Sequence, residues 1–104
     1  HEEGYIPILA MGPAWEQSFI ESISGEGDEK TLAMQPTRIQ EFINAVRQKY
    51  EALGLQGENP VLMTSPTIRP YVRSIIERFR PQTHVISQNE IHPKARIKTV
   101  GQLQ

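Results

Sequence analysis

"PVLMTSPTIRPYVRSIIERFRP", residues 60–81, carries the pattern that decides the fold. Residues 60–63 are apolar, so residues 61–64 read as a buried strand. The polar turn after this strand leads into apolar residues at helical spacing. One face of that helix would hold Ile68, Tyr71, Val72, Ile75, Ile76 and Phe79. We therefore predict a strand, a turn and a helix whose apolar face packs against a sheet containing residues 61–64 and 84–87.

Strands and helices are predicted to alternate along the rest of the chain. Further strands are expected at 5–11, 31–35, 83–88 and 96–103, and further helices at 12–25 and 36–55. This alternation favours an α/β fold, with a small mixed sheet of about four to five strands flanked by helices.

Prolines and glycines fix several expected boundaries. Pro7 favours an edge position or a strand end for residues 5–11. Pro13 suits the first position of the helix at 12–25, and Gly25 suits its end. Gly54 is expected to close the helix at 36–55.

The composition limits the chemistry that the chain can perform. With 104 residues the chain is one domain or a piece of one. It contains no cysteine, which excludes disulfides, zinc–thiolate sites and thiol catalysis. No apolar run approaches the ~18 residues that span a membrane. The start, "HEEGYIPILAM", is acidic and lacks the basic leader of a signal peptide, so we expect a fragment of a longer protein.

Charge is distributed unevenly along the chain. The net charge is −1, but residues 1–63 sum to −6 and residues 64–104 to +5. Helical spacing puts Arg69, Arg73 and Arg80 on one side, away from the apolar stripe. These three arginines are candidates for a contact surface with an acidic partner, although a solvated face explains them equally simply.

The turn before the helix resembles an anion site. The helix is expected to begin near Pro66, with Ser65 or Thr67 as its cap. Ser65, Thr67, Arg69 and Arg73 could together bind a phosphate at a helix start. The glycines and the lysine of a phosphate loop are absent, however, so an ordinary cap with a solvated arginine face, Arg73 paired with Glu77, is the favoured interpretation.

Other kinds of site find little support. His84, Glu90 and His92 lack a recognisable metal-ligand spacing, so we expect no metal. No serine lies in a G-x-S-x-G elbow, and no RNP-like strand or zinc finger indicates nucleic-acid binding. Trp15 is expected in the core, with an exposed edge as a further candidate contact for a partner.

The chain resembles a known family over nearly its whole length. The specific part is "PVLMTSPTIRPYVRSIIERFRPQTHVISQNEI", residues 60–91, followed by "IKTVGQL" at 97–103. An upstream strand and helix, "ILAMGPAWEQ", is similar too. These segments resemble the C-terminal end of the FlhA family, the export-gate proteins of flagellar type III secretion, and of their relatives in virulence secretion.

The resemblance implies a role without catalysis. Members of this family are integral inner-membrane proteins of bacteria, anchored through an N-terminal part that this sequence lacks. Their cytosolic regions form a homo-oligomeric ring that receives chaperone-delivered export substrates and cooperates with an ATPase complex. The resemblance thus implies a docking and assembly module with no catalytic residue and no cofactor. The alternatives are a small α/β phosphate-binding domain of an enzyme and the equivalent domain of a virulence type III secretion export gate.

The same resemblance suggests how the chain divides. Residues 36–104 would be the C-terminal α/β subdomain. Residues 1–35 would be its first strand–helix unit or the end of a preceding helical subdomain.

Overall fold

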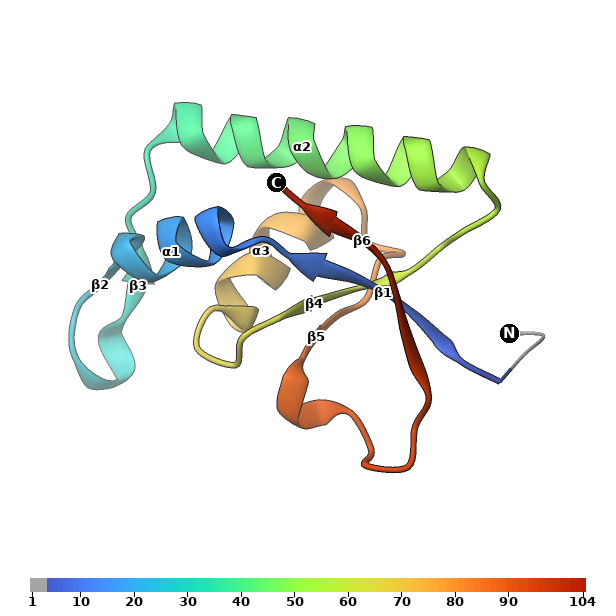
Figure 1. Ribbon diagram of the computed structural model, residues 1–104. Helices are drawn as coiled ribbons and strands as arrows, with labels where there is room; N and C mark the ends of the chain where they lie inside the picture. The colour runs from blue at the N-terminus through green and yellow to red at the C-terminus, as the bar shows by residue number, and fades with distance from the viewer. Residues whose placement is uncertain (1–3) are drawn as a thin grey trace.

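The computed structural model describes residues 4–104, in which four strands form a parallel sheet in the order β5-β4-β1-β6 (Figure 1). The sheet strands are β1 (Ile6–Met11), β4 (Val61–Thr64), β5 (Val85–Ser87) and β6 (Ile97–Leu103). The helices are α1 (Pro13–Ser22), α2 (Pro36–Leu55) and α3 (Arg69–Phe79). β2 (Ile23–Ser24) and β3 (Thr31–Leu32) pair as a separate antiparallel hairpin, and single 3₁₀ turns lie at Gly27–Glu29 and Gln88–Glu90. The α/β fold predicted from the sequence is confirmed, and the main sheet is wholly parallel.

The path of the chain places the helices on one face of the sheet. From β1 the chain steps to its neighbour β4 and then to β5, always in the same direction across the sheet. Parallel strands are joined by right-handed crossovers, so both connections pass over the same face. The return from β5 to β6 runs in the opposite direction, so the same rule sends residues 88–96 over the other face. Figure 1 shows this segment on the side of the sheet away from α2.

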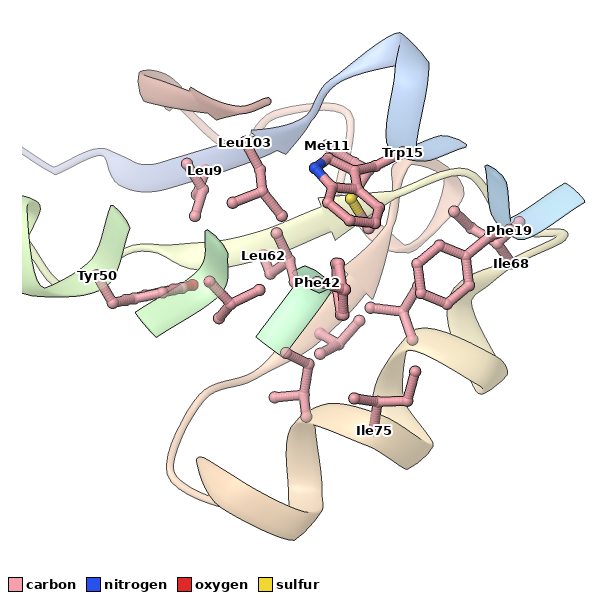
Figure 2. Close-up of a cluster of buried hydrophobic side chains, with 14 of the residues drawn as sticks. Leu9, Met11, Trp15, Phe19, Phe42, Tyr50, Leu62, Ile68, Ile75 and Leu103 are labelled. Atoms are coloured by element: carbon pink, nitrogen blue, oxygen red, sulfur yellow. The ribbon is translucent and has the colours of Figure 1, made fainter. Parts of the chain in front are cut away.

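The core lies between the sheet and the helices. Leu9 is the register partner of Leu62, and Leu62 is that of Val85, so these three side chains form a row across β1, β4 and β5. Figure 2 shows Leu9, Leu62 and Leu103 turned toward Phe42 and Ile75, which come from α2 and α3. All of these residues are buried.

Phe42 is the aromatic centre of this core. Its ring meets Trp15 at 5.2 Å and Phe19 at 5.0 Å between centroids, in both cases edge to face. Phe42 and Phe19 are completely buried. Edge-to-face pairs add to the free energy of burial, so Phe42 couples α2 to α1.

The expected packing of α3 is confirmed in its main part. Ile68, Val72, Ile75 and Ile76 are buried in the core, whereas Phe79 is half-buried at the last turn. α2 has the predicted bounds, and its buried side chains Phe42, Val46, Tyr50 and Leu53 recur at the spacing of one helix face.

The predicted start of α3 is wrong. The helix begins at Arg69 after Ile68, so neither Ser65 nor Thr67 caps it, and residues 66–68 form a turn. The physical reason is Pro70. A helix beginning at Pro66 would place Pro70 in its interior, where the ring clashes and a backbone hydrogen bond is lost. In the observed helix Pro70 lies in the first turn, where a backbone N–H would have no partner within the helix, so its absence costs nothing.

Three other details differ from expectation. α1 ends at Ser22, before Gly25, because Ile23–Ser24 pairs with β3. α2 ends at Leu55 as predicted, but Gly57, with φ +80°, rather than Gly54 takes the left-handed turn after it. The predicted strand at 31–35 is reduced to Thr31–Leu32 and lies outside the main sheet.

Pro7 is compatible with a strand end but not with an edge. β1 lies between β4 and β6, and its pairing with β4 starts only at Ile8. The missing N–H of Pro7 therefore falls before the doubly paired part of the strand. Among residues 4–104, no helix is both long and apolar enough to cross a membrane.

Truncation of Phe42 tests this core. We expect Phe42→Ala to lower the free energy of unfolding by about 3–5 kcal/mol, because it leaves a cavity where three elements meet. Leu55→Ala is the matched control on the same helix, since Leu55 is 87% exposed, and its change should stay within about 0.5 kcal/mol. Urea denaturation of both variants measures the difference. Equal losses would show that Phe42 is not central to the core.

Candidate functional site

Arg69 and Arg73 lie one turn apart on α3 and face a groove of about 310 Å³ beside β5. We call this the α3–β5 groove; it is lined by Arg69, Arg73, Ile76, Glu77, Pro81, Thr83, His84, Val85 and Ile86. β5 is the edge strand of the sheet in residues 4–104, so the groove follows a strand edge that no strand in this part of the chain covers. Its floor is apolar and its α3 wall is charged.

Both arginines of the groove have an acidic neighbour. Arg69 Nε lies 2.5 Å from Glu90 Oε1, as an ion pair whose angle does not meet hydrogen-bond geometry. Arg73 Nε lies 3.8 Å from Glu77 Oε2, which is the pair predicted from the i, i+4 spacing. The Arg73–Glu77 pair is exposed, and pairs of that kind contribute little to stability, so Arg73 can exchange its partner at small cost. Arg69 is partly buried, and its Nε is inaccessible to solvent.

Glu90 is held in place by the backbone and side chain of Ser87. Its Oε1 accepts hydrogen bonds from Ser87 N at 3.0 Å and from Ser87 Oγ at 2.8 Å. These bonds lower the pKa of Glu90, and the charges of Arg69 and Arg73 lower it further. The carboxylate therefore stays ionised and positions Arg69 at the entrance of the groove.

The predicted phosphate constellation is not assembled. Ser65 N donates to Glu16 Oε2 at 2.9 Å, so a carboxylate of α1 already occupies this backbone donor. Ser65 Oγ is buried without a hydrogen-bond partner in residues 4–104, and Thr67 is exposed. A bound phosphate would meet the charge of Glu16, so the turn does not act as an anion site.

Arg80 lies just beyond the end of α3. The helix ends at Phe79, and Arg80 leaves helical geometry with φ −141° and ψ 63°. Its Nε donates to Thr83 Oγ1 at 2.8 Å, and its guanidinium lies 4.4 Å from the centroid of the Tyr50 ring. Arg80 therefore ties the end of α3 to α2, and its part in one surface with Arg69 and Arg73 stays a prediction.

Tyr50 completes this structural contact. Its hydroxyl donates to Pro60 O at 3.0 Å, just before β4. Burial raises the pKa of Tyr50, so the ring stays neutral and the hydroxyl keeps its proton for this bond.

Trp15 is not available to a partner. The side chain is 4% exposed, and the Arg38 guanidinium covers its ring at 3.8 Å from the centroid. The prediction of an exposed Trp15 edge is therefore wrong, because the first turn of α2 lies over it. No sequence signal pointed to Arg38 as the cover.

The other sequence candidates stay apart. Within residues 4–104 no group of three His, Cys, Asp or Glu side chains could hold a metal ion. His84 lines the α3–β5 groove, whereas His92 Nδ1 accepts a hydrogen bond from Lys94 N at 3.0 Å in the following loop.

Comparison with known proteins gives the chain a context. Residues 1–96 match the FHIPEP family. Over 100 residues the chain is 59% identical to the flagellar biosynthesis protein FlhA of Caulobacter vibrioides, and this match covers 96% of the chain and 14% of that protein. The chain therefore spans about one seventh of the length of this relative.

Solved structures share the fold. The Chlamydia pneumoniae CdsV protein, solved in a complex of CdsV and CdsO, superposes with a TM-score of 0.78 and 28% identity, over 97% of this chain and 30% of that one. Nonameric EPEC SctV-C superposes with a TM-score of 0.79 over 98% of this chain and 30% of that one. Its identity is 23%, so this second likeness concerns the fold alone.

The position of Glu90 predicts an acid-sensitive contribution to stability. Because folding lowers the pKa of Glu90 below its ordinary value, the contribution is fully present above the pKa of the unfolded chain and is lost as pH falls through the pKa of the folded chain. We expect Glu90→Gln to be less stable than the natural chain near pH 7, and the difference to shrink toward about pH 3. Urea denaturation across this range measures it, with the exposed Glu51→Gln as control. A difference that grows at acid pH would contradict the assignment.

Proposed function

The chain belongs to the FHIPEP family, and from this membership we propose that it forms the C-terminal cytosolic subdomain of a flagellar type III export-gate protein. The 59% identity to a flagellar FlhA over almost the whole chain is the observation that carries the proposal. The membrane anchor would belong to the part of the protein that precedes this sequence. Residues 36–104 would form the C-terminal α/β subdomain, with residues 1–35 as its first strand–helix unit.

We propose a role in docking and assembly rather than in catalysis. The donors that resembled a phosphate site lie beside internal carboxylates: Glu16 for Ser65 and Glu90 for Arg69. Such internal partners suit a surface that exchanges one acidic contact for another. They do not suit the binding of a transferable phosphate.

The proposed partners are other copies of the parent protein and the machinery that delivers export substrates. The nonameric assembly of a protein with the same fold supports a ring. The CdsV–CdsO complex of a related chain supports binding of an accessory protein to this kind of domain. Export chaperones with their substrates and the export ATPase complex complete the proposed set.

The α3–β5 groove is the proposed docking surface for an acidic partner. Arg69 and Arg73 supply charge, and Ile76 and Val85 are the apolar side chains that line the groove on the helix-covered face of the sheet. Charges at such a rim act mainly on the rate and specificity of association. An acidic segment entering the groove would replace Glu77 and Glu90 as the neighbours of the two arginines.

Neutralising the groove tests this role. In the full-length protein we expect Arg69→Gln with Arg73→Gln to reduce flagellar export and swimming, because the attraction for an acidic partner is lost while the core is untouched. Arg78→Gln with Arg96→Gln removes the same charge at exposed positions outside the groove and serves as control.

Circular dichroism of both double variants would confirm folding first. Binding of the partner to the natural protein should also weaken as salt rises. A folded groove variant that exports normally would remove the α3–β5 groove from the proposal.

A further inference from the structure

The sheet is apolar on both faces, but the helices of this chain cover only one. The second face carries Ile6, Ile8, Ala10, Val61, Met63, Ile86 and Ile97, as the register across the four strands shows. Parallel sheets occur almost only where both faces are covered. No helix in residues 4–104 covers this second face, so its cover must come from the segment between β5 and β6 or from polypeptide outside these residues.

Residues 88–96 cover part of this face. Ile8 is completely buried although it lies outside the core cluster, which fits a crossing of this segment over the centre of the sheet. This segment does not cover the first residues of β1 and β6. Ile6 is 38% exposed and Ile97 is 43% exposed, and the two are register partners on neighbouring strands. We call this pair the Ile6–Ile97 patch.

We infer that the Ile6–Ile97 patch is the docking site for the part of the same polypeptide that precedes this sequence. This inference rests on the proposed function, in which the chain is the last subdomain of a longer protein. The first support is length: the chain spans only 14% of its Caulobacter relative, so abundant polypeptide is available to form the missing layer.

The second support is the position of the patch. β1 begins at Ile6, so polypeptide that arrives at this strand arrives beside the patch. A segment tethered so closely has a high effective concentration and needs only a small apolar contact to stay bound. A second copy of the chain would have to bind the same small patch without that advantage, so the preceding segment is the favoured occupant.

Photo-cross-linking in the full-length protein tests the inference. The photoreactive amino acid p-benzoylphenylalanine would be placed at Ile97, and in a control at Ile20, which is 45% exposed on α1. Mass spectrometry of the cross-linked peptides then identifies the neighbour. We expect Ile97 to give an intramolecular cross-link to residues that precede this sequence, independent of protein concentration, and Ile20 to give none.

A second pair of variants guards against a folding defect at the labelled site. Ile6→Thr with Ile97→Thr keeps β-branched side chains in both strands but removes the apolar contact. We expect this variant to be cleaved faster by protease just before residue 1, and Ile20→Thr to be cleaved at the natural rate.

Each possible result of the two experiments either supports the inference or overturns it. Cross-links to a second copy, or a yield at Ile97 no greater than at Ile20, would overturn the inference, as would unchanged cleavage of the double variant. Both readouts are independent of export, so they can fail while the proposed export function holds. Conversely, normal export by the groove variants would not change the cross-linking result or the cleavage result.

Discussion

β1 is hydrogen-bonded on both sides, to β4 through Ile8–Ala10 and to β6 along its whole length, and the rest of the structure depends on this double pairing. Because β1 is both first in the described chain and central in the sheet, β4 and β6 can join only by long crossovers. The right-handed sense of these crossovers puts α2 and α3 on one face and residues 88–96 on the other. The core, the α3–β5 groove and the Ile6–Ile97 patch all follow from that arrangement.

The charged residues of the groove show how donors that resemble a phosphate site can already have partners within the fold. Arginines beside a helix start suggest phosphate binding, but Glu16 and Glu90 reach the same donors from elsewhere in the fold. Each internal pair costs little to open, since its members are partly exposed. The surface is thus suited to recognising an acidic protein segment, in which specificity comes from several weak contacts.

Sequence reasoning found the elements whose signals are local. The apolar stripe of α2 and the face of α3 were predictable, because a buried helix face repeats with a fixed period. The start of α3 was mispredicted, since Ser65 and Thr67 are good caps, and Pro70 opposes a helix that starts at Pro66 but not one that starts after Thr67. The central place of β1 was missed because Pro7 suggests an edge, and the partners of a strand are set by the whole topology.

The same holds for the candidate site, where contacts set by local spacing were predictable and contacts between distant residues were not. The Arg73–Glu77 pair was predictable from its i, i+4 spacing. The contact between Ser65 and Glu16 joins residues 49 positions apart, and nothing local indicates it. The contacts of Arg80 with Tyr50 and of Arg38 with Trp15 each join two helices, so no local spacing in the sequence indicates them.

Native-state hydrogen exchange tests the central role of β1 most directly. If the double pairing of β1 holds the fold together, the amides of Ile8–Ala10 should exchange only through global unfolding, at the same opening free energy as the most protected amides of α2 and β4. The β2–β3 hairpin should open at a much lower free energy. Exchange of Ile8–Ala10 through a smaller, local opening, with β4 and α2 still protected, would contradict the account.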